Sequence, residues 1–154
     1  MAGQKLLLPY NFTSYDQKAL EFIIKMFAHL EEIEITLFHA YTPLPSVEVE
    51  NNSITGKLRA NISYLNTKIT EQEFALQSVK EKLTDQGISD SMIKCVFKPR
   101  KKDRAAEIIS LHANEKFDYI VLSRKPGQIS RFFTGSVHNK VVTALKDVTV
   151  CIVS

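Results

Sequence analysis

The residues best placed to do chemistry form a basic loop, Arg124 to Arg131, followed by the dipeptide Gly135-Ser136. The loop begins one residue after an apolar run, Tyr119 to Leu122, and the dipeptide opens a helix-like segment. The N–H groups in the first turn of a helix lack intrahelical partners and carry the positive end of the helix dipole, so they attract anions. The sequence therefore predicts a place for an anion, such as a phosphate, where this strand, loop and helix meet.

The elements that must position this loop alternate along the chain. Apolar, strand-like runs alternate with segments in which apolar residues recur every three or four positions. Strands are predicted at 5–9, 34–40, 92–97, 118–123 and 148–153, and helices are predicted to start near Thr13 or Ser14, Leu58, Asp103 and Gly135. Strands joined through helices lie parallel, with helices on both faces of the sheet. The pattern predicts a doubly wound α/β fold, in which ligands bind beyond the carboxyl ends of the strands.

The second predicted helix is unusually long. From Leu58 to Gln86 the apolar residues follow a four-three spacing that is interrupted only at Gln72, and Gly87 supplies a stop. At 1.5 Å per residue this helix would span roughly 40 Å, about twice the length of a typical strand. We therefore expect its first half to extend beyond the sheet.

Length and composition favour one globular domain covering residues 1–154. The chain is 44% hydrophobic, and its N-terminus carries no long apolar run, which argues against a signal peptide or a membrane span and for a cytoplasmic protein. A net charge of +3 permits an anionic ligand without requiring nucleic acid. The basic run Lys98 to Arg104 has no helix-turn-helix or aromatic stacking platform beside it, so nucleic-acid binding is not expected.

Other chemistry-bearing side chains are scattered. The histidines have no partners at metal-ligand spacing, and no nucleophile motif or pair of carboxylates predicts a catalytic residue, so neither a metal nor catalysis is expected. Asp16 and Glu21, on the first helix, are interpreted as surface groups. His39 ends a strand near the expected crevice, where it could either touch a ligand or be packed against its neighbours.

Three stretches of the chain resemble the universal stress protein family. They are the opening Leu6-Leu7-Leu8-Pro9-Tyr10-Asn11 with Ser14, the second-strand end Leu37-Phe38-His39-Ala40 with Pro43, and the C-terminal part, in which 118–122 is followed by Ile129 to Val137 and a closing strand. The resemblance implies a sheet of strand order 3-2-1-4-5. It also implies that Asn11, Ala40 and the basic loop face one crevice, and that Cys95 and Cys151 lie on opposite edge strands, about four strand spacings apart and too distant for a disulfide.

The nucleotide motif of the family is only partly kept. Members that bind ATP carry a glycine, two residues, a second glycine, nine residues and then a glycine followed by Ser or Thr. In this chain only Gly135-Ser136 remains, and the earlier glycine positions fall on Leu122 and Lys125 or on Ser123 and Pro126, depending on the alignment. Gly127 could take the place of one of the missing glycines at a shifted position, and Arg124, Lys125 and Arg131 could supply charge to a phosphate.

Asn11 stands where nucleotide-binding members usually have an aspartate that meets adenine. An amide oxygen can still accept a hydrogen bond from the adenine amino group. The resemblance therefore leaves two functions open. The first is a non-enzymatic stress-response protein that needs no cofactor and acts as a homodimer, paired through the last strand, with an unidentified protein partner or ligand. The alternative is an adenine-nucleotide switch or slow ATPase, with Gly135 and Ser136 holding the terminal phosphate of ATP.

Overall fold

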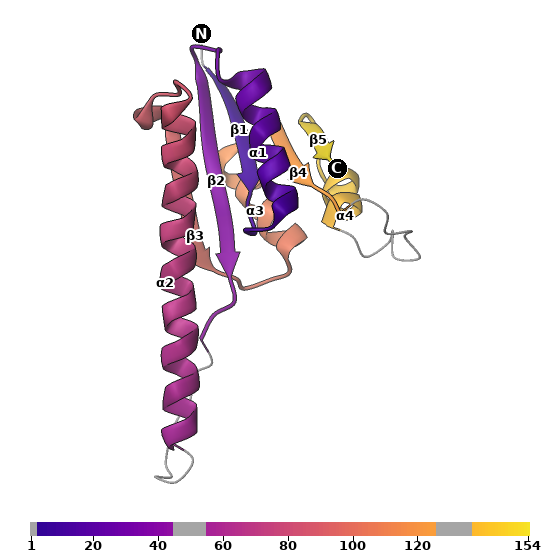
Figure 1. Ribbon diagram of the computed structural model, residues 1–154. Coiled ribbons are helices and arrows are strands. Elements are labelled where there is room, and N and C mark those ends of the chain that lie inside the picture. The colour runs from indigo at the N-terminus through magenta and orange to yellow at the C-terminus, as the bar shows by residue number, and fades with distance from the viewer. Residues whose placement is uncertain (1–2, 45–54, 126–136) are drawn as a thin grey trace.

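The structure is a computed structural model that describes residues 3–44, 55–125 and 137–154. The described residues form a five-stranded sheet of order β3-β2-β1-β4-β5, and all four neighbouring pairs are parallel (Figure 1). The strands are β1 Gln4–Pro9, β2 Ile33–Tyr41, β3 Ile93–Pro99, β4 Tyr119–Ser123 and β5 Thr149–Val153. The predicted fold and strand order are therefore confirmed.

Four described α-helices connect the strands, together with a short 3-10 turn at Asp90–Met92. They are α1 Ser14–Phe27, α2 Thr55–Asp85, α3 Arg104–Glu115 and α4 Val137–Ala144. Two separate apolar clusters show that α1 and α2 cover one face of the sheet and that α3 and α4 cover the other. No helix among the described residues is long and apolar enough to span a membrane.

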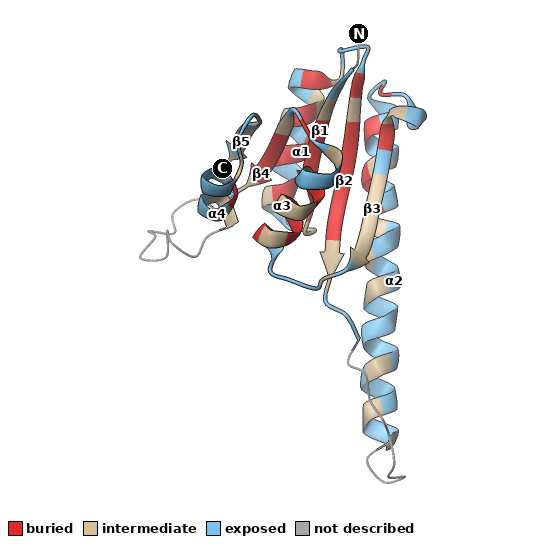
Figure 2. Ribbon diagram, turned by 180° about the vertical axis from the view of Figure 1, so that it is seen from behind, coloured by how far each residue is buried: buried red, intermediate tan, exposed pale blue. Residues whose placement is uncertain are grey.

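The central strand β1 supplies both clusters. Leu6 and Leu8 pack under α1 and α2, whereas Leu7 points to the opposite face with α3 and α4, and all three are fully buried. Successive side chains of a strand point to opposite faces, so three leucines in a row serve a strand that is covered on both sides. Figure 2 shows this buried centre as red segments of the sheet.

Helix α2 extends beyond the sheet, as its length predicted (Figure 1). Leu76, Val79 and Leu83 are buried against the sheet, whereas Leu65 in the projecting half is 39% exposed. The helix ends before Gly87, whose φ of 100° lies in the left-handed region that favours glycine at a helix end. The N–H of the next residue, Ile88, donates to the carbonyl of Leu83, which closes the helix.

The edges of the sheet carry the two cysteines. Cys95 lies on β3 and Cys151 on β5, which are the two outer strands, as the resemblance implied. Both thiols are free and partly buried, and burial raises the pKa of each. The cysteines therefore sit with three strands between them.

Candidate functional site

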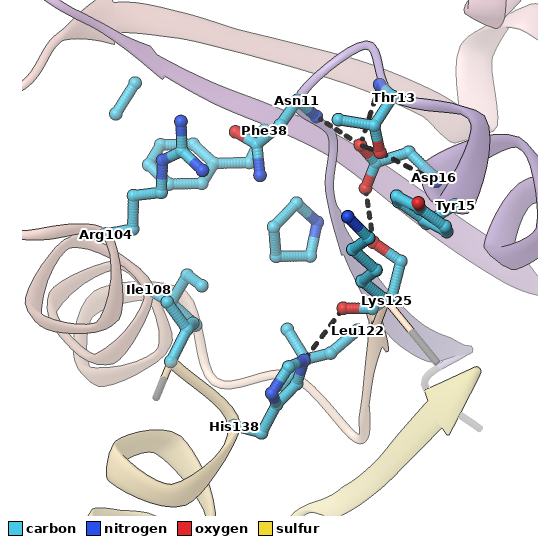
Figure 3. Close-up of a pocket in the computed structure, with 14 residues that line it drawn as sticks. Asn11, Thr13, Tyr15, Asp16, Phe38, Arg104, Ile108, Leu122, Lys125 and His138 are labelled. Carbon is cyan, nitrogen blue, oxygen red and sulfur yellow. Dashed lines mark hydrogen bonds between the residues drawn. The ribbon is translucent and has the colours of Figure 1, made fainter. Parts of the chain in front are cut away.

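A pocket of about 230 Å³ opens beyond the carboxyl ends of β1 and β4, where the winding of the sheet reverses (Figure 3). Its position is the one that parallel α/β sheets favour for ligands. The lining residues are Pro9, Asn11, Thr13, Tyr15, Asp16, Phe38, Ala40, Arg104, Ile108, Leu122, Ser123, Lys125, Val137 and His138. An apolar side formed by β2 and α3 therefore faces a polar side formed by the start of α1 and the end of β4.

The polar side is built around the carboxylate of Asp16, which is only 2% exposed. Its Oδ2 accepts hydrogen bonds from the N–H groups of Asn11 and Thr13, both at 3.1 Å, and from the Thr13 hydroxyl at 2.7 Å. Thr13 is the N-cap of α1 and accepts from the Asp16 N–H in return, which makes a capping box. Asp16 thus fixes the turn that presents Asn11 to the pocket.

The interpretation of Asp16 as a surface group is wrong. Its other oxygen, Oδ1, accepts from the Ser123 hydroxyl at 2.6 Å, and Ser123 lies 107 residues further along the chain. The pairing of β1 with β4 brings the two together. A single helix pattern contains no information on that long-range neighbour, which covers the carboxylate.

The same end of β4 also holds His138, from the start of α4. His138 Nε2 lies 2.8 Å from the carbonyl oxygen of Ser123, and because a carbonyl can only accept, Nε2 is the donor. His138 also lines the pocket. Ser123 therefore ties α1 and α4 to the end of β4.

His39 is packed and does not line the pocket. It is 6% exposed, its Nδ1 donates to the carbonyl of Tyr10 at 2.7 Å, and its ring lies between those of Phe12 and Phe97 at 4.8 and 5.7 Å. Burial lowers the pKa of His39, although the hydrogen bond to Tyr10 acts in the opposite direction. Of the two roles predicted for this histidine, the structure shows the packed one.

The surroundings of His39 explain two local irregularities. Gln72 interrupts the apolar spacing of α2 at a point where its polar side chain lies near His39. Phe12 has a φ of 62°, a left-handed conformation that costs an L-residue about 1–2 kcal/mol. The packing of the Phe12 ring against His39 and Tyr10 offsets this strain and shapes the turn that begins at Asn11.

The structure brings three of the predicted site residues to the pocket: Asn11, Ala40 and Lys125. It does not bring Arg124 there. The N–H of Arg124 donates to the carbonyl of Val153 at 2.8 Å, and its Nε donates to the Ser154 hydroxyl at 3.2 Å. The remaining predicted residues, Gly127, Arg131, Gly135 and Ser136, lie outside the described residues.

Several pocket residues were not predicted: Thr13, Tyr15, Asp16, Arg104, Ser123 and His138. The spacing Thr13-x-x-Asp16 is a capping-box pattern and could have revealed the first polar pair. Arg104 stands directly after Asp103, the predicted and observed N-cap of α3. Nothing in the local sequence separates it from its basic neighbours.

The basic run from Lys98 to Arg104 is held by Glu107, which is 5% exposed. Glu107 accepts from the N–H groups of Lys101 and Lys102 at 2.8 and 3.0 Å and pairs with Lys98 at 3.5 Å. Burial alone would raise the pKa of Glu107, but these donors and the Lys98 charge outweigh burial and lower it. Within the described residues, no group of three or more His, Cys, Asp or Glu side chains could hold a metal ion.

Comparison of the sequence with known protein families agrees with the observed fold. The sequence model of the Universal stress protein family matches residues 3–151, and the chain belongs to this family. Comparison with curated proteins gives no significant match.

Solved structures show the same architecture. The universal stress protein UspA from Lactobacillus plantarum is 12% identical, with a TM-score of 0.69 over 100% of this chain and 99% of that chain. A universal stress protein from Archaeoglobus fulgidus in complex with dAMP is 13% identical, with a TM-score of 0.64 over 100% of both chains. A family protein from Arabidopsis thaliana with AMP bound is 14% identical, with a TM-score of 0.59 over 97% of this chain and 90% of that chain. At these identities the likeness concerns the fold.

Proposed function

We propose that this chain is a stress-response protein that binds an adenine nucleotide in the pocket between β1 and β4 as a regulatory ligand and does not turn it over. The observation that carries the proposal is a pocket at the winding reversal with an apolar side and an opposite, polar side that includes a lysine. Phe38 and Ala40 supply the apolar side, and Lys125 supplies charge across from them. Two proteins of the same fold contain dAMP and AMP, which supports this ligand class.

The base would lie at the apolar side, with its amino group donating to the side-chain oxygen of Asn11. The phosphate would then lie toward Lys125 at the end of β4, where an ammonium group attracts it. Asp16 and Ser123 would position this site indirectly, because their hydrogen bonds hold the turn that carries Asn11.

Absence of turnover is part of the proposal. Asp16 already accepts four hydrogen bonds, so its oxygens are committed to the fold and not to activating a water molecule. The alternative, a slow ATPase, depends on Gly135 and Ser136, which lie outside the described residues. Incubation with ATP and magnesium should release no phosphate beyond the buffer control, and measurable release would favour the ATPase instead.

Nucleotide binding is tested by isothermal titration of the whole protein with AMP. Ala40→Leu should weaken AMP binding at least tenfold, because the added atoms enter the apolar side of the pocket. Ala60→Leu makes the same change on the exposed, projecting half of α2 and should leave binding unchanged. At AMP concentrations near 100 times Kd, the wild-type protein should gain about 2.7 kcal/mol of stability. No binding of AMP or dAMP would refute the proposed ligand.

We also propose that the protein acts as a homodimer paired through β5. In the described part of the sheet β5 pairs only with β4, and its residues Val150 to Val153 are apolar and partly exposed, with Ile152 44% exposed. An apolar edge strand of this kind exposes unpaired N–H and C=O groups that a second copy can satisfy. Sedimentation equilibrium at tens of micromolar should show a dimer.

A further inference from the structure

Arg104 lies at the apolar side of the pocket, together with Phe38 and Ile108 (Figure 3). It is the first residue of α3, and its side chain is exposed. Figure 3 shows Arg104 on the opposite side of the pocket from Tyr15 and Lys125. Among the described residues that line the pocket, Arg104 and Lys125 are thus two cations at different ends, with Lys125 on the polar side.

The charge of Arg104 has no carboxylate partner in the described part of the chain. The two nearest acids in sequence are already engaged: Asp103 pairs with Lys140 at 3.2 Å, and Glu107 pairs with Lys98 at 3.5 Å. A cation in the first turn of a helix also meets the positive end of the helix dipole, which is unfavourable. Neither an ion pair nor the helix therefore explains an arginine at this position.

The size of the pocket limits what its enclosed part can hold. Its volume of about 230 Å³ lies below the roughly 300–1,000 Å³ that is typical of sites for drug-sized ligands. A base fits this space better than a whole nucleotide, so the phosphate would project from it. The apolar side chains around Arg104 favour the base at that end, because they offer no hydrogen bonds to a phosphate.

We propose that Arg104 stacks its guanidinium group on the exposed face of the bound base and closes the apolar end of the pocket. This inference rests on the proposed nucleotide binding. The guanidinium group is planar, always charged and more weakly hydrated than an ammonium group, so it stacks on aromatic faces as lysine does not. The contact would favour purines, which present the larger ring system, over pyrimidines.

The test uses the whole protein with AMP and with the fluorescent analogue 2-aminopurine riboside 5′-monophosphate, whose emission is quenched when its base is stacked. The variants are Arg104→Ala and Arg104→Lys. The control is Lys102→Ala, which removes a charge from the same basic run at a residue that does not line the pocket. Circular dichroism would verify that each variant is folded.

Both Arg104 variants should weaken AMP binding by about tenfold, which corresponds to about 1.4 kcal/mol, and should reduce the quenching of the saturated analogue. The control should change neither. If Arg104→Lys binds AMP as tightly as the wild-type protein and neither variant changes the quenching of the analogue, Arg104 acts through its charge alone. That result would overturn the proposed stacking. Wild-type affinity in Arg104→Ala would overturn this inference and leave nucleotide binding standing. Failure of the wild-type protein to bind AMP would overturn both.

Discussion

The most direct test of the site concerns Asp16, whose carboxylate joins the start of α1 to the end of β4. Replacement by alanine removes the acceptor of four hydrogen bonds, donated by two backbone N–H groups and two hydroxyls. Replacement by asparagine keeps the shape. Its amide oxygen can face the three donors of the turn, and its amino group can donate to the Ser123 hydroxyl, which rotates to accept.

The two substitutions should therefore differ in cost. For Asp16→Ala, the N–H groups of Asn11 and Thr13 lose their acceptor at about 1 kcal/mol each, because the turn is exposed enough for water to reach them. The hydroxyls of Thr13 and Ser123 can turn to other acceptors, so their loss together adds about 1 kcal/mol. The expected total is about 3 kcal/mol. Asp16→Asn loses only the charge-assisted part of the bonds, about 1 kcal/mol. Ser123→Ala removes a single partner and should cost about 1 kcal/mol.

Urea denaturation measures these differences, and an unchanged slope with denaturant would show that only stability has moved. AMP binding should weaken in Asp16→Ala more than in Asp16→Asn, because the alanine variant leaves the turn that carries Asn11 unsupported. If Asp16→Ala costs less than 1 kcal/mol, the carboxylate does not organise the turn. If the two variants cost the same, shape-preserving rescue by the amide is refuted.

Three further outcomes follow from burial and exposure. Burial lowers the pKa of His39 below its ordinary value of 6.5. The contribution of the neutral imidazole to stability is therefore fully present above about pH 6.5 and is lost as the pH falls through the folded-state pKa. His39→Gln should flatten this part of a stability profile measured by urea denaturation from pH 5 to 7. Leu76→Ala should lower the free energy of unfolding by about 2–5 kcal/mol in urea denaturation, because Leu76 is 1% exposed. Ile62→Ala, on the projecting half of the same helix, should lower it by at least about 2 kcal/mol less. Equal losses would contradict the exposure of that half. Ile152→Lys should convert the proposed dimer to a monomer in sedimentation equilibrium, whereas Val142→Lys, at a comparably exposed residue of α4, should not. A wild-type monomer at tens of micromolar would refute the β5 interface.

Much of the fold was predictable because its signals are local. The alternation of apolar runs with three- and four-residue spacing defines parallel strands joined by helices, and parallel strands place a ligand crevice at their carboxyl ends. The length of α2 and its end before Gly87 also follow from neighbouring residues. Asn11, Ala40 and Lys125 were predicted for the pocket on the strength of a family resemblance, and the structure brings them there.

The residues that sequence reasoning missed depend on contacts between distant parts of the chain. Ser123 covers Asp16 from 107 residues away, and Arg104 reaches the pocket only because α3 packs on the face that carries Phe38. His39 is likewise enclosed by rings from other parts of the chain, those of Phe12 and Phe97. A local sequence pattern carries no information on such contacts between distant parts of the chain.

Arg124 and Lys125 show most clearly what the sequence determines and what the tertiary structure decides. The sequence alone determined that a strand ends here and that two cations follow it, because hydrophobicity and turn residues act over a few positions. Only the tertiary structure decided which cation meets the pocket. The N–H of Arg124 continues the ladder from β4 to β5 and its side chain reaches Ser154, so Lys125 lines the pocket instead. Pairing register turns adjacent side chains to different sides, and register is set by the whole sheet.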